Sequence, residues 1–207
     1  MLQGLYVLTS DCVYPHHTWI ERTEQIIRGG ADYIQLREKN LSDQQLLPLA
    51  QDMQRLCDDY AVTLIINDRV ELAKRINADG VHIGKSDGSL RHAREHLGVD
   101  KIIGVSCYRS IYQALMAQKQ GADYVAFGRL FSSHTKPLAQ QCPLGVLQNA
   151  CKLLQPSVCA IGGITADNVN LPLRAGAHLI ASSHTVFNAQ DPFQEANNFH
   201  QVAIMRR

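Results

Sequence analysis

The hydrophobic positions of this chain fall into eight short runs, which are separated by longer stretches of mixed character. The runs are rich in Ile, Val, Leu and Tyr, and each has the length of a β-strand. Buried parallel strands have this pattern, and each intervening stretch is long enough for a helix with two loops. The predicted strands are 5–9, 33–36, 63–66, 80–83, 102–105, 124–127, 158–161 and 179–181.

The stretches between the runs carry signals for helix boundaries. Ser42 precedes apolar residues at helical spacing, Ser110 is predicted to cap a helix over 111–119, and Thr165 to cap one that begins at Ala166. Small residues recur just before several strands, as in Gly29-Gly30-Ala31-Asp32. Glycine at such a position ends a helix in the left-handed conformation. The repetition predicts turns of similar geometry.

Eight strand–helix units in 207 residues favour a (β/α)₈ TIM barrel, with residues 1–207 forming one domain. An open, doubly wound sheet is the alternative, but it seldom needs eight parallel strands in so short a chain. The longest predicted irregular segment is 128–143, after the sixth strand. Loops of this length in a compact domain are usually functional.

Composition narrows the function classes further. A net charge of +1 argues against a nucleic-acid protein with a broad basic face, and no apolar stretch is long enough to cross a membrane. The N-terminus lacks a basic leader, so we expect a cytoplasmic protein. A homo-oligomer is a separate expectation. Six cysteines without a Cys-x-x-Cys pair are expected to be reduced, several of them buried.

Polar side chains follow three neighbouring predicted strands. Gln35, Arg37 and Lys39 alternate along one strand end, so they should point to the same side, with Glu38 between them. Arginine and lysine suit phosphate oxygens, and ligands of α/β folds bind at the carboxyl ends of the strands. Solvated charges at a strand end are the alternative reading of these residues.

Asp68 and Asp87 follow the third and fourth predicted strands. Each alone could be a helix cap, but together, beside cationic side chains, they favour Mg²⁺ bound mainly through a diphosphate and water. Gly162-Gly163, after the seventh strand, and the segment 181–187, at the end of the eighth, are candidate phosphate sites.

Two further groups could bind ligands. The segment 132–137 offers hydroxyls and a lysine that could close over a phosphate, with His134 in a minor role at most. His92 and His96 stand four residues apart in a helical segment, so they could share a face. Without a third ligand in view, we interpret them as surface histidines.

Several motifs in order resemble the thiamine-phosphate synthase family over nearly the whole chain. They include Gln35-Leu36-Arg37-Glu38-Lys39, Ile66-Asn67-Asp68-Arg69, Gly80-Val81-His82-Ile83-Gly84 and Ala160-Ile161-Gly162-Gly163. The resemblance implies a barrel enzyme that joins a pyrimidine diphosphate to a thiazole phosphate.

The resemblance also implies a role for each site residue. The pyrimidine diphosphate would be bound by Gln35, Arg37, Glu38, Lys39, Asn67, Ser106 and Lys136, of which Arg37, Lys39, Ser106 and Lys136 would be catalytic. Asp68 and Asp87 would hold Mg²⁺. The thiazole phosphate would be bound by Ser133, His134, Thr135, Gly163, Ser183 and His184, through side chains or backbone N–H groups.

The family mechanism would ionise the pyrimidine CH₂–O bond before the thiazole nitrogen attacks, so no enzymatic nucleophile is needed. Three alternatives remain at this stage. They are a thiazole tautomerase-like barrel, a non-catalytic sensor of phosphate ligands, and a sugar-phosphate isomerase or aldolase with Lys39 or Lys85 as a Schiff-base lysine. The joint presence of Arg37, Lys39, Lys136 and two aspartates favours the synthase.

Overall fold

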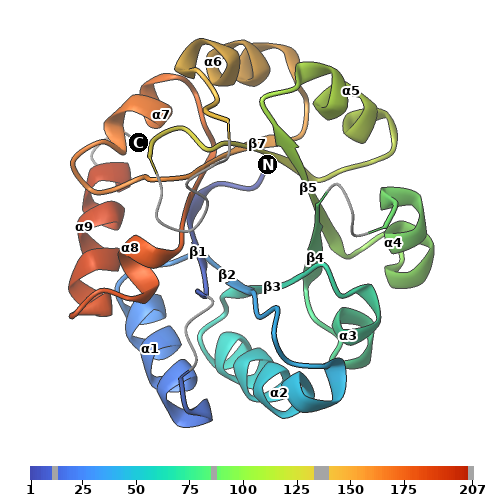
Figure 1. The fold of residues 1–207 in the computed structure, drawn as a ribbon, viewed down its shortest axis with the longest axis vertical. Coiled ribbons are helices and arrows are strands. Elements are labelled where there is room, and N and C mark those ends of the chain that lie inside the picture. The colour runs from blue at the N-terminus through green and yellow to red at the C-terminus, as the bar shows by residue number, and fades with distance from the viewer. Residues whose placement is uncertain (11–13, 85–87, 133–139, 205–207) are drawn as a thin grey trace.

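A computed structural model describes residues 1–10, 14–84, 88–132 and 140–204 of the chain. Eight parallel strands close into a barrel in the order β1 to β8, and helices form a ring outside it (Figure 1). The strands are β1 (Gly4–Leu8), β2 (Tyr33–Leu36), β3 (Thr63–Asn67), β4 (Gly80–Ile83), β5 (Ile102–Tyr108), β6 (Tyr124–Phe127), β7 (Ser157–Ile161) and β8 (Leu179–Ser182). The predicted (β/α)₈ TIM barrel is confirmed.

In the described chain one helix follows each strand from β1 to β7, and two helices follow β8. The helices are α1 (His16–Arg28), α2 (Asp43–Asp59), α3 (Val70–Arg75), α4 (Leu90–Leu97), α5 (Ile111–Lys119), α6 (Leu144–Leu153), α7 (Asn170–Arg174), α8 (His184–Phe187) and α9 (Pro192–Ile204). None of them is both long and apolar enough to cross a bilayer, as far as the described residues show.

Local capping chemistry sets several of these boundaries. The Ser42 hydroxyl accepts the Gln45 N–H and completes a capping box for α2, and the Ser110 hydroxyl caps α5 as predicted. The prediction that Thr165 caps a helix beginning at Ala166 is wrong. Instead, the Thr165 N–H donates to Asn168 Oδ1 in a turn, and α7 begins only at Asn170. A turn closed by an asparagine side chain competes with a cap.

The recurring small-residue turns at the amino ends of the strands share one contact, which we call a latch. In a latch, the side chain that follows the small residues accepts a backbone N–H of the preceding strand. Glycines such as Gly30 adopt a positive φ, as predicted. The acidic residue that follows them has a structural role. Asp32 Oδ2 accepts the Leu5 N–H at 2.8 Å, and Asp79 and Asp123 repeat this contact to the strands before them. Each latch ties one strand to its neighbour, so the turns help to set the barrel register.

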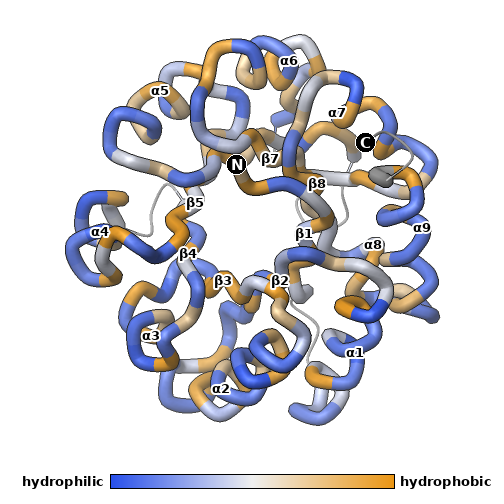
Figure 2. The backbone as a smooth tube through the Cα atoms, turned by 180° about the vertical axis from the view of Figure 1, so that it is seen from behind, coloured by the Kyte–Doolittle hydropathy of each residue, from blue (hydrophilic) through white to orange (hydrophobic). Residues whose placement is uncertain are grey.

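Two hydrophobic layers enclose the barrel wall. The larger lies between the strands and the helices, and the smaller fills the barrel interior around Tyr6, Ile65, Tyr124 and Cys159. Seen from behind, hydrophobic colour runs along much of the strands, whereas the outer helical turns are mostly hydrophilic (Figure 2). A Cβ atom at Gly104 would overlap the Tyr124 ring, so this glycine makes room for the tyrosine.

Cysteines contribute to both layers. Cys57, Cys107, Cys142 and Cys159 are buried, which confirms that several of them serve as small apolar residues. Burial raises the pKa of the Cys57 and Cys107 thiols to about 12. These thiols therefore stay protonated at neutral pH and are poor nucleophiles.

Candidate active site

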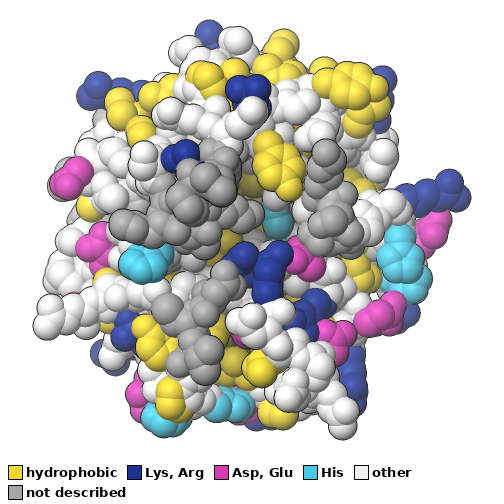
Figure 3. Space-filling model, in the orientation of Figure 1, with side chains coloured by type: hydrophobic (Ala, Val, Ile, Leu, Met, Phe, Trp, Pro, Cys, Tyr) yellow, Lys and Arg dark blue, Asp and Glu magenta, His cyan; other side chains and the backbone are white. Residues whose placement is uncertain are grey.

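A cavity of about 520 Å³ opens at the carboxyl ends of the strands. Near the centre of the face shown in Figure 3, Lys and Arg side chains gather beside acidic ones. Nine of the residues predicted for the site line this cavity: Gln35, Arg37, Lys39, Asn67, Asp68, Ser106, Gly163, Ser183 and His184.

An ion pair bridges two loops at the mouth of the cavity. Lys39 Nζ lies 3.4 Å from Asp68 Oδ2, and the two side chains are 51% and 22% exposed. Asp68 has a positive φ of 63°, and its N–H donates to the His82 carbonyl at 2.8 Å. A positive φ is uncommon for a non-glycine residue, although aspartate tolerates it better than most. The turn after β3 places Asp68 in the cavity lining.

Arg37 is held in place through its backbone. The Thr9 hydroxyl donates to the Arg37 carbonyl at 3.0 Å and accepts the Arg37 N–H at 2.8 Å. Because one side chain satisfies both backbone groups, the chain leaves β2 in a fixed direction. This direction brings both Arg37 and Lys39 to the cavity lining, as the alternation in the sequence predicts.

Glu38 does not line the cavity. Its carboxylate is buried and accepts the backbone N–H groups of Asn40 and Leu41, which shapes the loop after β2. Arg69 supports the same loop, because its guanidinium donates to the Glu38 and Leu41 carbonyls and pairs with Asp43 at 2.7 Å. Both residues position the loop that carries Lys39.

A chain of hydrogen bonds forms the floor of the cavity. Gln35 Nε2 donates to the Tyr6 hydroxyl at 2.6 Å, and the Tyr6 and Tyr124 hydroxyls lie 2.8 Å apart. His82 Nδ1 lies 2.9 Å from the Tyr124 hydroxyl, and His82 Nε2 lies 2.8 Å from Ser106 Oγ. Burial raises the pKa of both tyrosines well above the ordinary value, so they remain neutral.

The direction of the floor hydrogen bonds follows from counting protons. Tyr6 accepts from Gln35, so its own proton is best used toward Tyr124, and the Tyr124 proton toward His82. His82 then carries its proton on Nε2 and donates to Ser106. In this arrangement the protons of both tyrosine hydroxyls and of His82 Nε2 have acceptors, and the Ser106 hydroxyl can donate its own proton to a ligand in the cavity.

Two buried oxygens at the cavity are unsatisfied. Within the described part of the chain, neither Gln35 Oε1 nor Ser182 Oγ has a hydrogen-bond partner. Leaving such groups unpaired costs about 1–3 kcal/mol each. Both residues line the cavity, so these oxygens lie next to the space that a ligand would fill.

The wall formed by β7 and β8 is made of small residues. Gly162 and Gly163 both have positive φ, and a Cβ atom at Gly163 would overlap the Ser132 carbonyl. The Phe131 N–H donates to the Gly162 carbonyl at 2.9 Å, which ties the loop after β6 to this turn. Ser183 and His184, at the start of α8, complete this wall.

Comparison with known proteins identifies the family. The family model of thiamine monophosphate synthase matches residues 5–186. The chain belongs to this family. The thiamine-phosphate synthase of Azoarcus sp. (strain BH72) is 44% identical over 195 residues, covering 94% of each chain. That of Alcanivorax borkumensis is 42% identical over 190 residues, covering 92% of this chain and 88% of the relative.

A solved structure agrees with these matches. The thiamine phosphate pyrophosphorylase of Pyrococcus furiosus superposes with a TM-score of 0.89 at 30% identity, covering 98% of this chain and 96% of the other. Membership of the thiamine monophosphate synthase family confirms the predicted enzyme class, a transferase. The individual residue roles that the resemblance implies stay predictions.

The remaining residues predicted for the site lie outside the described residues. They are Asp87, which was expected as the second metal ligand, and Ser133, His134, Thr135 and Lys136.

Sequence reasoning missed Tyr6, His82 and Tyr124 as site residues. Each occupies a strand, where an aromatic ring reads as part of the core. His82 lies within a family motif, but the motif alone does not indicate a role for it. Its signal was a polar residue inside a predicted strand, directly before the motif's Ile83-Gly84.

Proposed function

We propose that the protein is a thiamine-phosphate synthase that joins 4-amino-2-methyl-5-hydroxymethylpyrimidine diphosphate to 4-methyl-5-(2-phosphoethyl)thiazole. One structural observation carries the proposal. Arg37, Lys39 and Asp68 gather at one side of a cavity whose floor presents Gln35 and Ser106. A substrate with a charged diphosphate and a flat, polar heterocycle matches both features.

The floor suits an aminopyrimidine. Its amino group needs an acceptor, and Gln35 Oε1 is a buried acceptor without a partner among the described residues. A ring nitrogen needs a donor, and the hydrogen-bond chain leaves the Ser106 proton for that purpose. Because Tyr6 fixes the Gln35 amide and His82 fixes Ser106, both contacts are set before the substrate arrives.

The charged mouth suits the departing diphosphate. In the reaction, the pyrimidine CH₂–O bond breaks and its electron pair leaves with the diphosphate. The lone pair of the thiazole nitrogen then forms the new C–N bond. Arg37 and Lys39 would stabilise the negative charge that develops on the leaving oxygen. Asn67, beside them in the cavity wall, would bind the same substrate.

Asp68 fits the role of a Mg²⁺ ligand. It offers a carboxylate at the cavity, and its neighbour Lys39 is a cation that would pair with the substrate phosphate. Magnesium is commonly held by one or two protein carboxylates together with substrate phosphates. Asp87 is the proposed second ligand. Bound there, Mg²⁺ would help to neutralise the negative charge of the diphosphate.

A second part of the cavity wall suits the second substrate. Gly163, Ser183 and His184 come from β7 and β8 and the segments that follow them, and β1 lies between β8 and the strand that leads to Arg37. We assign the thiazole phosphate to this wall, with Ser133, His134, Thr135 and Lys136 as further proposed contacts. The loops after strands seven and eight are a common phosphate site in barrel enzymes.

The direct test is a reconstituted reaction. Purified protein is mixed with both heterocycles and Mg²⁺, and thiamine phosphate and released diphosphate are measured. Equal amounts of the two products are expected, and neither should form when one heterocycle or Mg²⁺ is left out. Binding of the thiazole phosphate without any product would contradict the proposal and favour a tautomerase-like barrel or a sensor.

Two properties beyond the reaction remain proposals. We propose a cytoplasmic location, which cell fractionation would test. A homo-oligomer is also proposed, and light scattering of the purified protein would determine its mass.

A further inference from the structure

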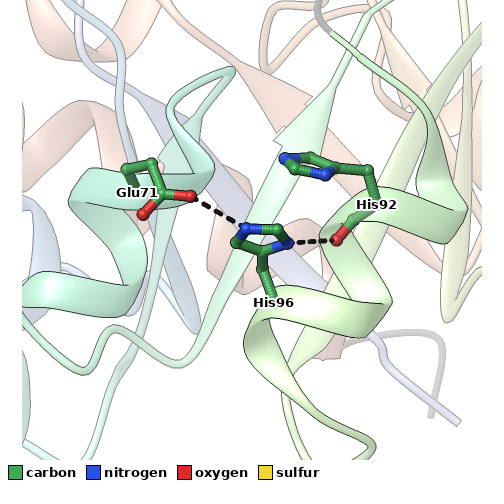
Figure 4. Close-up of side chains that lie close together, drawn as sticks. All are labelled: Glu71, His92 and His96. Carbon is green, nitrogen blue, oxygen red and sulfur yellow. Dashed lines mark hydrogen bonds and ion pairs between the residues drawn. The ribbon is translucent and has the colours of Figure 1, made fainter.

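A cluster of three metal-binding side chains lies outside the barrel, away from the proposed active site. It consists of Glu71 on α3 and of His92 and His96 on α4 (Figure 4). One ligand atom from each residue lies within 4.8 Å of the other two. The sequence showed the two histidines but no third ligand, and the packing of α3 beside α4 supplies it.

The hydrogen bonds of His96 determine which nitrogen faces the centre of the cluster. His96 Nδ1 lies 3.2 Å from the His92 carbonyl oxygen, so Nδ1 carries a proton and donates it. His96 Nε2 then faces Glu71 Oε1 at 3.3 Å. A nitrogen lone pair and a carboxylate oxygen repel each other at this distance unless a cation lies between them. That cation is either a proton or a metal ion.

The spacing of the ligand atoms suits a metal ion. A tetrahedral ion with ligand distances near 2.1 Å requires ligand atoms about 3.4 Å apart. The Glu71–His96 pair already has this separation. The His92 ring lies beside the His96 ring, with centroids 3.9 Å apart, and its exposed side chain has room to adjust.

We propose that Glu71, His92 and His96 form a binding site for a divalent transition-metal ion of the Zn²⁺ class, with water completing the coordination. Two imidazoles and one carboxylate are typical ligands of such ions, whereas Mg²⁺ prefers oxygen ligands. The hydrogen bond from Nδ1 to the His92 carbonyl orients His96, as outer contacts do in known metal sites. The bound ion would link α3 to α4.

The proposal makes a quantitative prediction for metal binding. Untagged protein is titrated calorimetrically with Zn²⁺ in a non-chelating buffer at pH 7.5, with excess Mg²⁺ present. Wild type should bind one equivalent more tightly than the His96→Ala variant does, by at least about tenfold in Kd. His92→Ala and Glu71→Gln should each weaken the same equivalent by a similar factor.

Two matched controls replace a surface glutamate and a surface histidine that lie outside the cluster. Glu95→Gln removes a carboxylate of α4 that pairs with Arg91 instead of joining the cluster. His16→Ala removes a histidine that pairs with Asp52 at 2.8 Å, a pair outside the three-residue cluster. Both controls should keep the Kd of wild type within about twofold.

A second measurement uses stability. Zn²⁺ binds only the folded site, so a hundredfold excess over Kd should raise the Tm of wild type by about 5 °C or more, with no such rise for His96→Ala. Equal Zn²⁺ binding by wild type and His96→Ala would overturn the site and leave a proton as the shared cation. If Glu71→Gln and Glu95→Gln weakened the binding of Zn²⁺ equally, Glu71 would not be a ligand of the ion.

Discussion

Lys39 Nζ and Asp68 Oδ2 lie 3.4 Å apart and join the loop after β2 to the loop after β3. The lysine and the aspartate thereby satisfy each other before any ligand is present. When a diphosphate and Mg²⁺ bind, we expect the lysine to turn to phosphate and the carboxylate to the metal. The ion pair keeps both groups at the cavity mouth without a large rearrangement.

Replacement of Asp68 should therefore weaken the binding of Mg²⁺ more than it weakens the fold. Asp68→Asn keeps the size of the side chain but removes its charge. We expect turnover to fall about a hundredfold, or about 3 kcal/mol, with a higher Mg²⁺ concentration needed for half-maximal rate. Diphosphate release across a Mg²⁺ series measures both quantities.

Asp43→Asn is the control for the Asp68 variant. Asp43 pairs with Arg69 at 2.7 Å and does not line the cavity. Its turnover should stay within about threefold of wild type. An unchanged Mg²⁺ requirement in Asp68→Asn would remove Asp68 from the metal site.

Arg37 should be needed for the parallel N–H donors of its planar guanidinium group as well as for its charge. Arg37→Ala removes both, and we expect it to lower kcat/KM about a hundredfold. Arg37→Lys keeps the charge without the parallel donors, so its rate should lie between those of wild type and Arg37→Ala. Arg55→Ala, which removes an exposed arginine of α2 paired with Asp52, should have no effect. Near-normal turnover in Arg37→Ala would contradict its assignment.

The strands could be predicted because burial on both faces leaves unmistakable apolar runs. Three predicted strands, at 33–36, 80–83 and 124–127, match β2, β4 and β6 at both ends. The strand predicted at 102–105 is longer in the structure, because β5 continues to Tyr108 through an irregularity between Ser106 and Tyr108. Such a bulge depends on the neighbouring strand, which a single sequence does not show.

The site could be predicted only where its residues lie at strand ends. Arg37 and Asp68 stand out because charge follows an apolar run. Tyr6 and Tyr124 meet only after the barrel closes, because 118 residues separate them in the chain. Glu38 was predicted to contact the ligand because it is a charged residue within a motif. In the structure its carboxylate accepts backbone N–H groups of its own loop, which the sequence does not reveal.

Gly104 should be among the glycines least tolerant of alanine. A Cβ atom there would overlap the Tyr124 ring, whose hydroxyl belongs to the floor of the cavity. We expect Gly104→Ala to cost about 1–3 kcal/mol of unfolding free energy, because the ring must move within a packed interior. Gly145→Ala in α6 has no atom within 4 Å of the new Cβ, so it should be neutral or stabilising. Urea unfolding compares the two variants.

His178 should make the stability of the barrel depend on pH. Its Nδ1 accepts the Val158 N–H at 3.0 Å, in the place where Asp32, Asp79 and Asp123 serve the other latches. Burial, and then the positive N-terminus, lowers the pKa of His178. The unfolded chain therefore takes up a proton near pH 6.5 that the folded chain resists. The contribution of this contact to the free energy of unfolding is fully present above that pH. It is lost as the pH falls toward the lowered pKa of His178.

The variant His178→Asp provides the test, because it restores the acceptor used by the other latches. At pH 8, His178→Ala should lose about 1–3 kcal/mol through the unpaired Val158 N–H, whereas His178→Asp should lose less. Between pH 8 and pH 5.5, wild type should lose more stability than His178→Asp, since an aspartate does not titrate in this range. Urea unfolding at both pH values gives the change in unfolding free energy with pH, the slope, for each protein. Because the other histidines are common to both proteins, equal slopes would mean that His178 does not control the acid sensitivity of the fold.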